Sequence, residues 1–477
     1  MAKRIIKSIV AFIPESLDLD KLLKENPPEF NYHVDNFKYL LTLMYENYDT
    51  QKYDDYGDIY TNLNAQLLQR RIRNYREHLD YLKKHNIIYE NKQYIPGVKS
   101  RGFSFHNIFG VAKIKEVLIT NQKLISKINK FYYLDDKNEI KLLNDELNID
   151  YITKWLNPKY LKIDCAKAEQ YLYDLADKER LSEKIRESVI QKFKKNKKLY
   201  NQKDIEKGVE LIVMNKFNCR LRVLKLFNKG IFNQIVDNTA GRLHTTLTQL
   251  KGDLRQFITF KNENLVAIDI VNSQPYLSYS LLNEESFVRN NISEKVSLLN
   301  PRFNTSNYLV ELTKLISKNT SKDDVLNFIE VIKSGKLYEE FGKILINKRI
   351  MVKHEDYRKE AKTIIFSSFF SKNQAKIFNK EIQIFEKEFP SVYQIFKTIK
   401  IKKHNALACL LQNLEAELVL HKACKIIAKN RPDIPIFTLH DAIITTESNK
   451  EYVYSVLHEV LTKNIGIEPT IKYEPWV

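Results

Sequence analysis

Residues 264–276 read Asn-Leu-Val-Ala-Ile-Asp-Ile-Val-Asn-Ser-Gln-Pro-Tyr, and this stretch decides the fold. The uninterrupted apolar run from Leu265 to Ile268 predicts a short buried strand. Asp269 follows that run directly. A carboxylate at the end of a buried strand is costly unless it is paired or bound to a cation. The stretch therefore predicts a strand whose acidic end needs a partner.

A second acidic residue occurs in a similar setting. Residues 434–446 read Ile-Pro-Ile-Phe-Thr-Leu-His-Asp-Ala-Ile-Ile-Thr-Thr, so two apolar strands flank His440 and Asp441 at a tight hairpin turn. Taken alone, a strand-end Asp is more often a turn residue, and a His-Asp pair can also belong to a phosphohydrolase metal site. Two carboxylates that share divalent cations are, however, what two-metal phosphoryl transfer requires.

A helix with a distinctive face lies between these strands. Arg358, Lys362, Phe366 and Phe370 are spaced by four residues, so a helix brings them onto one face. Cations and aromatic rings on that face suit a nucleoside triphosphate, because the cations bind phosphates and a ring stacks on the base. Such a face alone is more often an amphipathic surface, but chance would rarely place it between two strand-end aspartates.

Two further segments complete a pattern. Residues 239–250 read Thr-Ala-Gly-Arg-Leu-His-Thr-Thr-Leu-Thr-Gln-Leu, and Gln412 lies in Leu-Leu-Gln-Asn-Leu-Glu-Ala-Glu ahead of the hairpin. The order of all these segments, over residues 239–446, resembles the motifs of the family A DNA polymerases and the related single-subunit RNA polymerases. The Arg-x3-Lys-x3-Phe helix and the His-Asp hairpin are the more specific matches.

The resemblance implies a role for each matching residue. Asp269 and Asp441 would bind two Mg²⁺ ions, for which Mn²⁺ is an expected substitute, and the Ile270 carbonyl would be a further ligand. Arg358 and Lys362 would hold the triphosphate, and Phe366 would stack on the nucleoside. Phe370 takes the place of a later aromatic residue. The residues that would contact primer and template are Arg242, Arg255, Gln412 and His440.

Several positions depart from the family pattern. Ser367 and Ser371 replace the glycine that follows each aromatic residue of the helix. Gln274 stands where DNA polymerases carry the glutamate that excludes a ribose 2′-hydroxyl, and its bulk favours deoxynucleotides. Ala442 replaces a third carboxylate. The part before residue 236 is too short, and lacks the acidic signatures, for a proofreading exonuclease, so none is predicted.

The N-terminal part has a second candidate site. Residues 62–72 and 75–85 have helical apolar patterns, and residues 87–89 and 93–95 predict two strands about a turn at Asn91 and Lys92. Helix, basic helix and hairpin resemble a winged helix-turn-helix, which would seat basic side chains on nucleic acid. The alternative is an ordinary helical packing unit with a solvated basic face. The candidate nucleic-acid contacts are Arg70, Arg71, Arg73, Lys83, Lys99 and Arg101.

Composition fits a polyanionic partner. The 477 residues include 77 Lys and Arg against 59 Asp and Glu, a net charge of +18. Such an excess favours nucleic acid over merely solvated charge, because bound phosphates release condensed counterions. Four widely spaced cysteines without a Cys-x2-Cys pair argue against a zinc site and are compatible with a reducing cytoplasm. No apolar run is long enough to span a bilayer, and we expect no signal peptide.

We therefore predict an α+β right-hand polymerase with an antiparallel palm sheet, helical fingers and thumb, and an N-terminal winged-helix-like module. A helical, strongly basic stretch over 179–200 precedes the palm, where a thumb would lie. The predicted parts are 1–113 (N-terminal module), 114–235 (thumb-like), 236–282 (palm), 283–400 (fingers, with the triphosphate helix at 355–371) and 401–477 (palm).

Two other functions remain open. An RNA polymerase or primase-like enzyme would use NTPs and start chains de novo. A non-catalytic DNA-binding replication initiator would depend on the winged-helix-like segment, but the retention of both aspartates and of the Lys362 helix argues against a relic palm.

Overall fold

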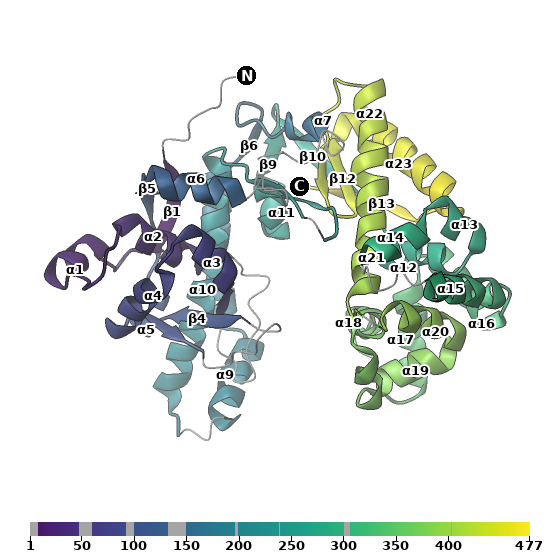
Figure 1. Cartoon of the computed structure of the whole chain (residues 1–477), viewed down its shortest axis with the longest axis horizontal. Coiled ribbons are helices and arrows are strands. Elements are labelled where there is room, and N and C mark those ends of the chain that lie inside the picture. The colour runs from purple at the N-terminus through teal and green to yellow at the C-terminus, as the bar shows by residue number, and fades with distance from the viewer. Residues whose placement is uncertain are drawn as a thin grey trace. The chain divides into compact units, whose positions relative to one another are not determined.

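The computed structural model of the chain describes residues 8–46, 60–91, 100–131, 149–195, 199–237, 239–299, 306–401 and 403–477. The chain forms two compact units, whose elements are labelled in Figure 1. Unit 1 comprises Met1–Asn148, Lys162–Phe232 and Gln249–Phe257, and unit 2 comprises Ile149–Leu161, Asn233–Thr248 and Ile258–Val477.

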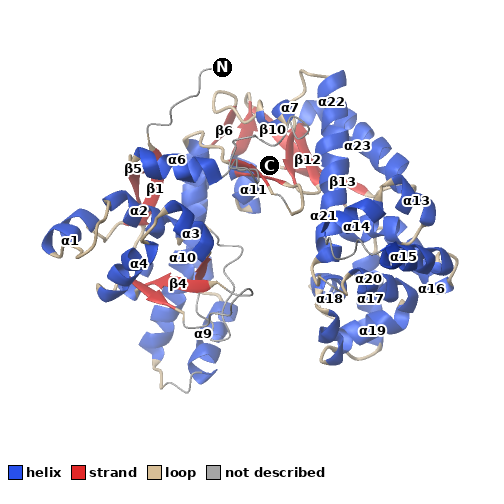
Figure 2. Ribbon diagram, viewed as in Figure 1, coloured by secondary structure: helices blue, strands red, loops and turns tan. Residues whose placement is uncertain are grey.

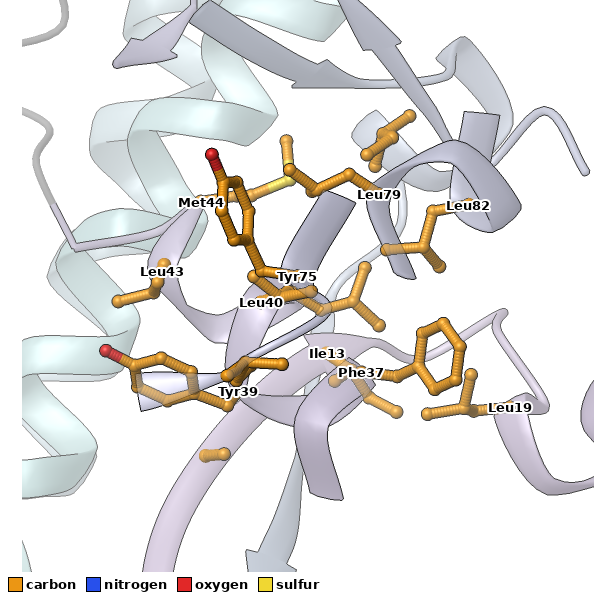
Figure 3. Close-up of a cluster of buried hydrophobic side chains, with 14 of the residues drawn as sticks. Ile13, Leu19, Phe37, Tyr39, Leu40, Leu43, Met44, Tyr75, Leu79 and Leu82 are labelled. Atoms are coloured by element: carbon orange, nitrogen blue, oxygen red, sulfur yellow. The ribbon is translucent and has the colours of Figure 1, made fainter. Parts of the chain in front are cut away.

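Unit 1 has its own hydrophobic core. Strands β1 (Ile9–Pro14) and β5 (Ile114–Ile119) pair antiparallel, and helix α2 (Val34–Leu43) packs on them. The next elements are α1 (Leu19–Glu25), β2 (Thr61–Leu63), α3 (Ala65–Arg71), α4 (Tyr75–Lys84), β3 (Ile88–Glu90), β4 (Arg101–Phe105), α5 (Asn107–Gly110) and α6 (Gln122–Phe131). Phe37, Leu40 and Leu82 lie in the buried cluster that these elements share (Figure 3). The β1–β5 pair joins residues on both sides of the predicted boundary at 113.

A small sheet accompanies the basic helix of unit 1. Strands β2, β4 and β3 pair antiparallel in that order. Helix α4 agrees with the helix predicted over 75–85, but α3 is shorter than the predicted 62–72. The reason is that residues 61–63 pair with β4, and the Asn64 side chain then caps α3 by accepting the N–H of Leu67. Lys92, the predicted strand 93–95 and Lys99 lie outside the described residues.

Three helices form the rest of the basic stretch. Helices α8 (Cys165–Arg180) and α9 (Glu183–Lys195) pack against α10 (Gln202–Asn228), and a 3₁₀ turn, Gly252–Phe257, lies against α8. The single helix predicted over residues 179–200 is wrong, because α8 ends before α9 begins. Ser182 stands between them, a residue type that favours helix starts, and its carbonyl accepts the N–H of Arg186.

Unit 2 is built on one sheet. Its strands lie in the order β11 (Phe437–Leu439), β12 (Ala442–Thr446), β10 (Glu263–Ile270) and β9 (Ile258–Phe260), and β13 (Ile471–Pro475) pairs with β10. The chain passes from unit 2 to unit 1 within β6 (Leu161–Ile163). Leu265, Val266 and Ile268 are fully buried in β10, as their apolar run predicts. Helix α23 (Lys450–Ile465) packs on β10 and β12. A separate antiparallel pair consists of β7 (Gln234–Val236) and β8 (Leu243–Thr245).

Helices make up most of the remainder of unit 2 (Figure 2). They are α7 (Asp150–Thr153), α11 (Thr246–Gln249), α12 (Ser273–Ser278), α13 (Glu284–Arg289), α14 (Ile292–Leu299), α15 (Ser306–Asn319), α16 (Asp323–Lys333), α17 (Leu337–Asn347), α18 (Tyr357–Phe370), α19 (Lys380–Glu388), α20 (Pro390–Ile399), α21 (Ala406–Ala416) and α22 (Cys424–Asn430). A π-helical segment, Glu417–Ala423, joins α21 to α22.

Helix α18 is the predicted basic and aromatic helix. Its inner face carries Ala361, Ile365 and Phe369, which are fully buried. The ring of Phe369 packs edge-on against Phe396, with centroids 4.7 Å apart. This packing fixes the rotation of the helix. The predicted face, with Arg358, Lys362, Phe366 and Phe370, therefore lies on a different side of the helix from these core residues.

Helices and antiparallel strands together make the mixed α and β fold that the sequence predicts. The division into palm, fingers, thumb and winged helix stays a prediction. Within the described part of the chain, no helix has the length and apolarity needed to span a membrane. The four cysteines, all within the described residues, form no disulfide bond.

Candidate active site

The unit 2 sheet brings the two predicted metal-binding aspartates together, one on a strand and one in a turn between strands. Asp269 in β10 lies opposite Ala442 of β12 and Lys472 of β13. Asp441 is in the two-residue turn between β11 and β12, and its carbonyl accepts the N–H of Ile270 at 3.4 Å. The sheet register therefore makes these residues, far apart in sequence, neighbours in space.

The Asp269 carboxylate is incompletely compensated. Burial raises the pKa of Asp269 to about 6, and the nearby charge of Asp441 adds to this effect. Lys472 opposes it through an ion pair, with Nζ 3.2 Å from Asp269 Oδ2. Asp441 accepts a hydrogen bond from Ser273 Oγ at 2.7 Å. Both Lys472 and Ser273 were missed by sequence reasoning, since neither has a pattern that marks it.

The residues present fit a divalent cation. Two carboxylates and a backbone carbonyl are the hard oxygen ligands that Mg²⁺ prefers. A cation between Asp269 and Asp441, both half-buried, would remove the cost of bringing two negative charges together. No cluster of three or more His, Cys, Asp or Glu residues able to hold a metal occurs in the described part of the chain. The site would therefore depend on these two carboxylates, completed by water or by oxygens of a bound ligand.

Two residues beside the aspartates have left-handed backbone conformations. The φ angles are 55° at Asn272 and 53° at His440. Asn272 is held there because its Nδ2 donates to the carbonyl of Gly335 at 2.7 Å. At His440 the turn between β11 and β12 demands this conformation, and the ring centroids of His440 and His244 lie 5.7 Å apart. Both conformations are costly for residues with a Cβ.

The predicted face of α18 forms an aromatic and cationic wall together with Tyr338 of α17. Tyr338 is buried, and its ring lies 6.2 Å from that of Phe366. Lys362 Nζ lies 5.5 Å from the Phe366 ring centroid, and the Arg358 guanidinium lies 5.5 Å from that of Tyr338. Arg358 also donates to Glu339 Oε1 at 2.5 Å. Sequence reasoning missed Tyr338, although it lies next to Glu339 in a segment with a helical apolar pattern.

A cavity of about 490 Å³ unites these groups. The predicted residues that line it are Arg242, Asp269, Ile270, Gln274, Arg358, Lys362, Phe366, Phe370, Gln412, His440 and Asp441. The lining residues not predicted include Ser273, Tyr338, Glu415 and Lys472. Arg255 belongs to unit 1 and does not line this cavity.

Arg242 reaches the cavity from a turn organised by Asp237. The Asp237 carboxylate accepts the backbone N–H groups of Thr239, Ala240 and Arg242. Burial opposes its ionisation, but these bonds and one with His244 hold the pKa of Asp237 at about 2. Gly241 has φ 68°, which explains a glycine in this tight turn.

Glu415 of α21 is the principal functional candidate that sequence reasoning missed. Its side chain is 1% exposed, and burial raises its pKa to about 7. Oε1 accepts from Arg242 Nε at 2.9 Å and Nη2 at 2.5 Å, and Oε2 accepts from Gln274 Nε2 at 2.6 Å. A signal existed, because Glu415 interrupts an apolar helix face three residues after Gln412.

The predicted basic residues of the N-terminal part lie in different environments. Arg71 is buried and bonded to the hydroxyl of Tyr39, so it is a core residue rather than a surface contact. Lys83 and Arg101 both pair with Glu90, at 2.5 and 2.8 Å. Arg70 and Arg73 are exposed, and Lys99 is outside the described residues.

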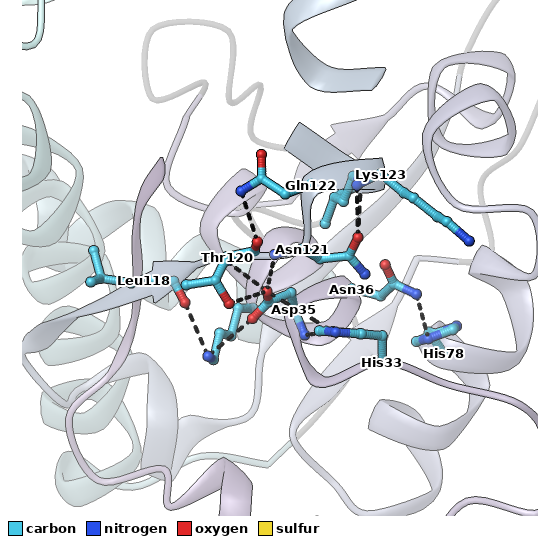
Figure 4. Close-up of polar contacts among 11 residues, drawn as sticks. His33, Asp35, Asn36, His78, Leu118, Thr120, Asn121, Gln122 and Lys123 are labelled. Atoms are coloured by element: carbon cyan, nitrogen blue, oxygen red, sulfur yellow. Dashed lines mark hydrogen bonds and ion pairs between the residues drawn. The ribbon is translucent and has the colours of Figure 1, made fainter. Parts of the chain in front are cut away.

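Unit 1 has a cavity of about 900 Å³ beside this region. Five cationic residues line it, against one acidic residue, Glu77: Arg71, Arg73, Arg76, Lys123 and Lys127. Asp35 fixes one wall by accepting the N–H groups of Thr120 and Asn121 at 2.7 and 2.8 Å (Figure 4). These bonds hold the start of α6, and with it Lys123.

No protein-family model matches the chain, and no curated protein is similar to it. Among solved structures, the chain is similar to the POL domain of Pol1 from M. smegmatis, solved in complex with DNA primer-template and dNTP. The two are 12% identical, and the match covers 74% of this chain and 73% of that chain with a TM-score of 0.34.

Proposed function

We propose that the chain is a template-dependent nucleotidyltransferase, a DNA polymerase of family A type without a proofreading exonuclease. One observation carries the proposal: a single cavity is lined by two neighbouring aspartates and by the cationic and aromatic face of α18. Carboxylates that attract divalent cations, facing groups that suit a triphosphate, are the combination that nucleotidyl transfer needs.

The proposed reaction forms a bond between the primer 3′-oxygen and the α-phosphorus of a dNTP. The bond from that phosphorus to the bridging oxygen breaks, and pyrophosphate leaves with the electron pair. Lys362 and Arg358 bind the triphosphate, and Phe366 stacks on the nucleoside. Arg242, Gln412 and His440 contact primer and template, with Arg255 as a further candidate from unit 1.

Asp269 and Asp441 would hold Mg²⁺, which would supply charge stabilisation for the attacking and leaving oxygens. The protein would contribute the two carboxylates as the oxygen ligands of the cation. Ser273, by donating to Asp441, orients that carboxylate in the cavity.

We also propose that the cation-lined cavity of unit 1 binds nucleic acid through its phosphates. The candidates that line it are Arg73, Arg76, Lys123 and Lys127, of which only Arg73 was predicted from sequence. The same cavity is the feature that favours the alternative of a DNA-binding initiator. Tight, sequence-specific duplex binding together with no nucleotide incorporation would support that alternative.

Primer extension on a defined template tests the proposed function. The wild type should incorporate dNTPs with Mg²⁺, and Asp441→Ala should lose activity on the order of 10²-fold or more. Asp433→Ala is a matched control, because Asp433 pairs with Arg431 at the surface and does not line the cavity. Full activity of Asp441→Ala would falsify the metal assignment.

A further inference from the structure

Gln274, Glu415 and Arg242 form a connected polar group inside the unit 2 cavity. They come from α12, from α21 and from the turn before β8. Glu415 receives two hydrogen bonds from Arg242 on one oxygen and one from Gln274 on the other. Both oxygens of the carboxylate are therefore engaged.

This group fixes the orientation of the Gln274 amide. An ionised carboxylate can only accept hydrogen bonds, so the NH₂ group of Gln274 must face Glu415. The amide oxygen then faces away from Glu415. The side chain of Gln274 is 9% exposed, and no group in the described residues donates to Oε1. A buried acceptor without a donor is costly, and it indicates a donor that arrives with a ligand.

The need for a hydrogen-bond donor limits which part of a bound nucleotide can contact Gln274 Oε1. The phosphates of a nucleoside triphosphate have no hydrogen to donate at neutral pH, and Arg358 and Lys362 on the α18 wall suit those phosphates. The sugar hydroxyls of the same nucleotide do donate, and a hydroxyl matches an amide oxygen well.

We propose that Glu415 is a positioning residue, which holds Gln274 so that its Oε1 accepts a hydrogen bond from a sugar hydroxyl of the bound nucleotide. This inference rests on the proposed function and deepens it. The residue at 274 then acts on the sugar through a directed acceptor, in addition to the bulk that the sequence indicates. The ion pair with Arg242 favours the ionised form of Glu415 against the effect of burial, and the ionised form holds the NH₂ group of the Gln274 amide toward Glu415.

The experiment compares kcat/KM for dNTP, NTP and ddNTP at pH 8, where Glu415 is ionised. Three variants are compared with the wild type: Gln274→Met, which keeps the volume and removes the acceptor, Glu415→Gln, and the double variant. If the 3′-hydroxyl is bound, the dNTP-to-ddNTP ratio should fall about five- to tenfold in each single variant. If the 2′-hydroxyl is bound, the NTP-to-dNTP ratio should fall instead.

The double variant distinguishes positioning from support of the fold. Because both residues act through one hydrogen bond, it should lose no more sugar discrimination than Gln274→Met alone. An equal loss of kcat/KM for all three nucleotides would overturn the proposal, and so would additive effects in the double variant. If Glu415→Gln fails to fold, Gln274→Met still provides the comparison of the three nucleotides. Absence of incorporation by the wild type would instead contradict the proposed function, so the two failures are distinguishable.

Discussion

Three carboxylates of unit 2 show how local environment separates structural from functional acids. Hydrogen bonds from the backbone and His244 hold the pKa of Asp237 at about 2 against the effect of burial. Burial and Asp441 raise the pKa of Asp269 to about 6. Glu415 is buried as well, but it is engaged on both oxygens. Asp237 is thus satisfied by its own turn, whereas Asp269 keeps an ionisation cost that the proposed cation would remove.

Lys400 is a buried cation outside the cavity. Its ammonium donates to the carbonyls of Ser368 and Ser371 at the end of α18, at 3.1 and 3.2 Å. Burial lowers its pKa from 10.5 to about 8. The folded state therefore binds fewer protons than the unfolded state between these values, and stability conferred by Lys400 rises with pH through that window.

We expect the free energy of unfolding of the wild type, relative to Lys400→Met, to increase by about 1 to 3 kcal/mol between pH 8 and pH 10.5. Urea denaturation at several pH values measures this difference. Lys397→Met is the control. Lys397 is exposed in α20, which Lys400 caps, and its substitution should show no such trend. A constant difference across the window would contradict the prediction.

At the scale of elements, the sequence predicts well what local pattern determines. The apolar run of β10, the β11–β12 hairpin and α18 each have a signal within one segment. The break between α8 and α9 was not predicted, because apolar and basic residues continue through it. The contact of Glu415 with Gln274 and Arg242 could not be predicted either, since it requires three distant segments to meet in the folded chain.

Helix α18 offers a matched pair of lysines. Lys362 lines the cavity, and Lys359, one turn earlier, is exposed and does not. Lys362→Ala should lower kcat/KM for the triphosphate about ten- to hundredfold, because it removes a charge-assisted bond. Lys359→Ala should remain near the wild type in the same steady-state assay. Equal effects of the two substitutions would show that α18 contributes only general positive charge.

At the scale of the whole molecule, the chain passes between the units at 148/149, 161/162, 232/233, 248/249 and 257/258. Each unit is therefore assembled from several segments. A fragment that began at residue 258 would omit Arg242 and leave Glu415 buried without its cation, which is strongly destabilising. The five predicted parts are consecutive in sequence. No local sequence signal indicates the points at which the chain passes from one unit to the other.

The net charge predicts that nucleic-acid binding is sensitive to salt. We expect part of that binding to occur at the cavity of unit 1. Arg73→Ala combined with Lys123→Ala should weaken binding of single-stranded DNA. The slope of log K against log salt should become shallower by about 0.7 for each phosphate that the variant no longer neutralises. Fluorescence anisotropy at several salt concentrations measures this slope. Lys24→Ala, an exposed change on α1 outside the cavity, should leave the slope unaltered.

The left-handed backbone at Asn272 and His440 has a consequence for how this chain tolerates change. Glycine adopts that conformation without the penalty that a Cβ imposes, so a library sorted for thermal resistance alone should enrich Gly at position 440, whereas at position 272 the hydrogen bond from Asn272 to Gly335 favours the natural residue. A library sorted for catalytic turnover should keep the natural side chain at His440. A difference between the two selections would show how much thermal stability the protein loses at this turn by placing an imidazole beside Asp269 and Asp441.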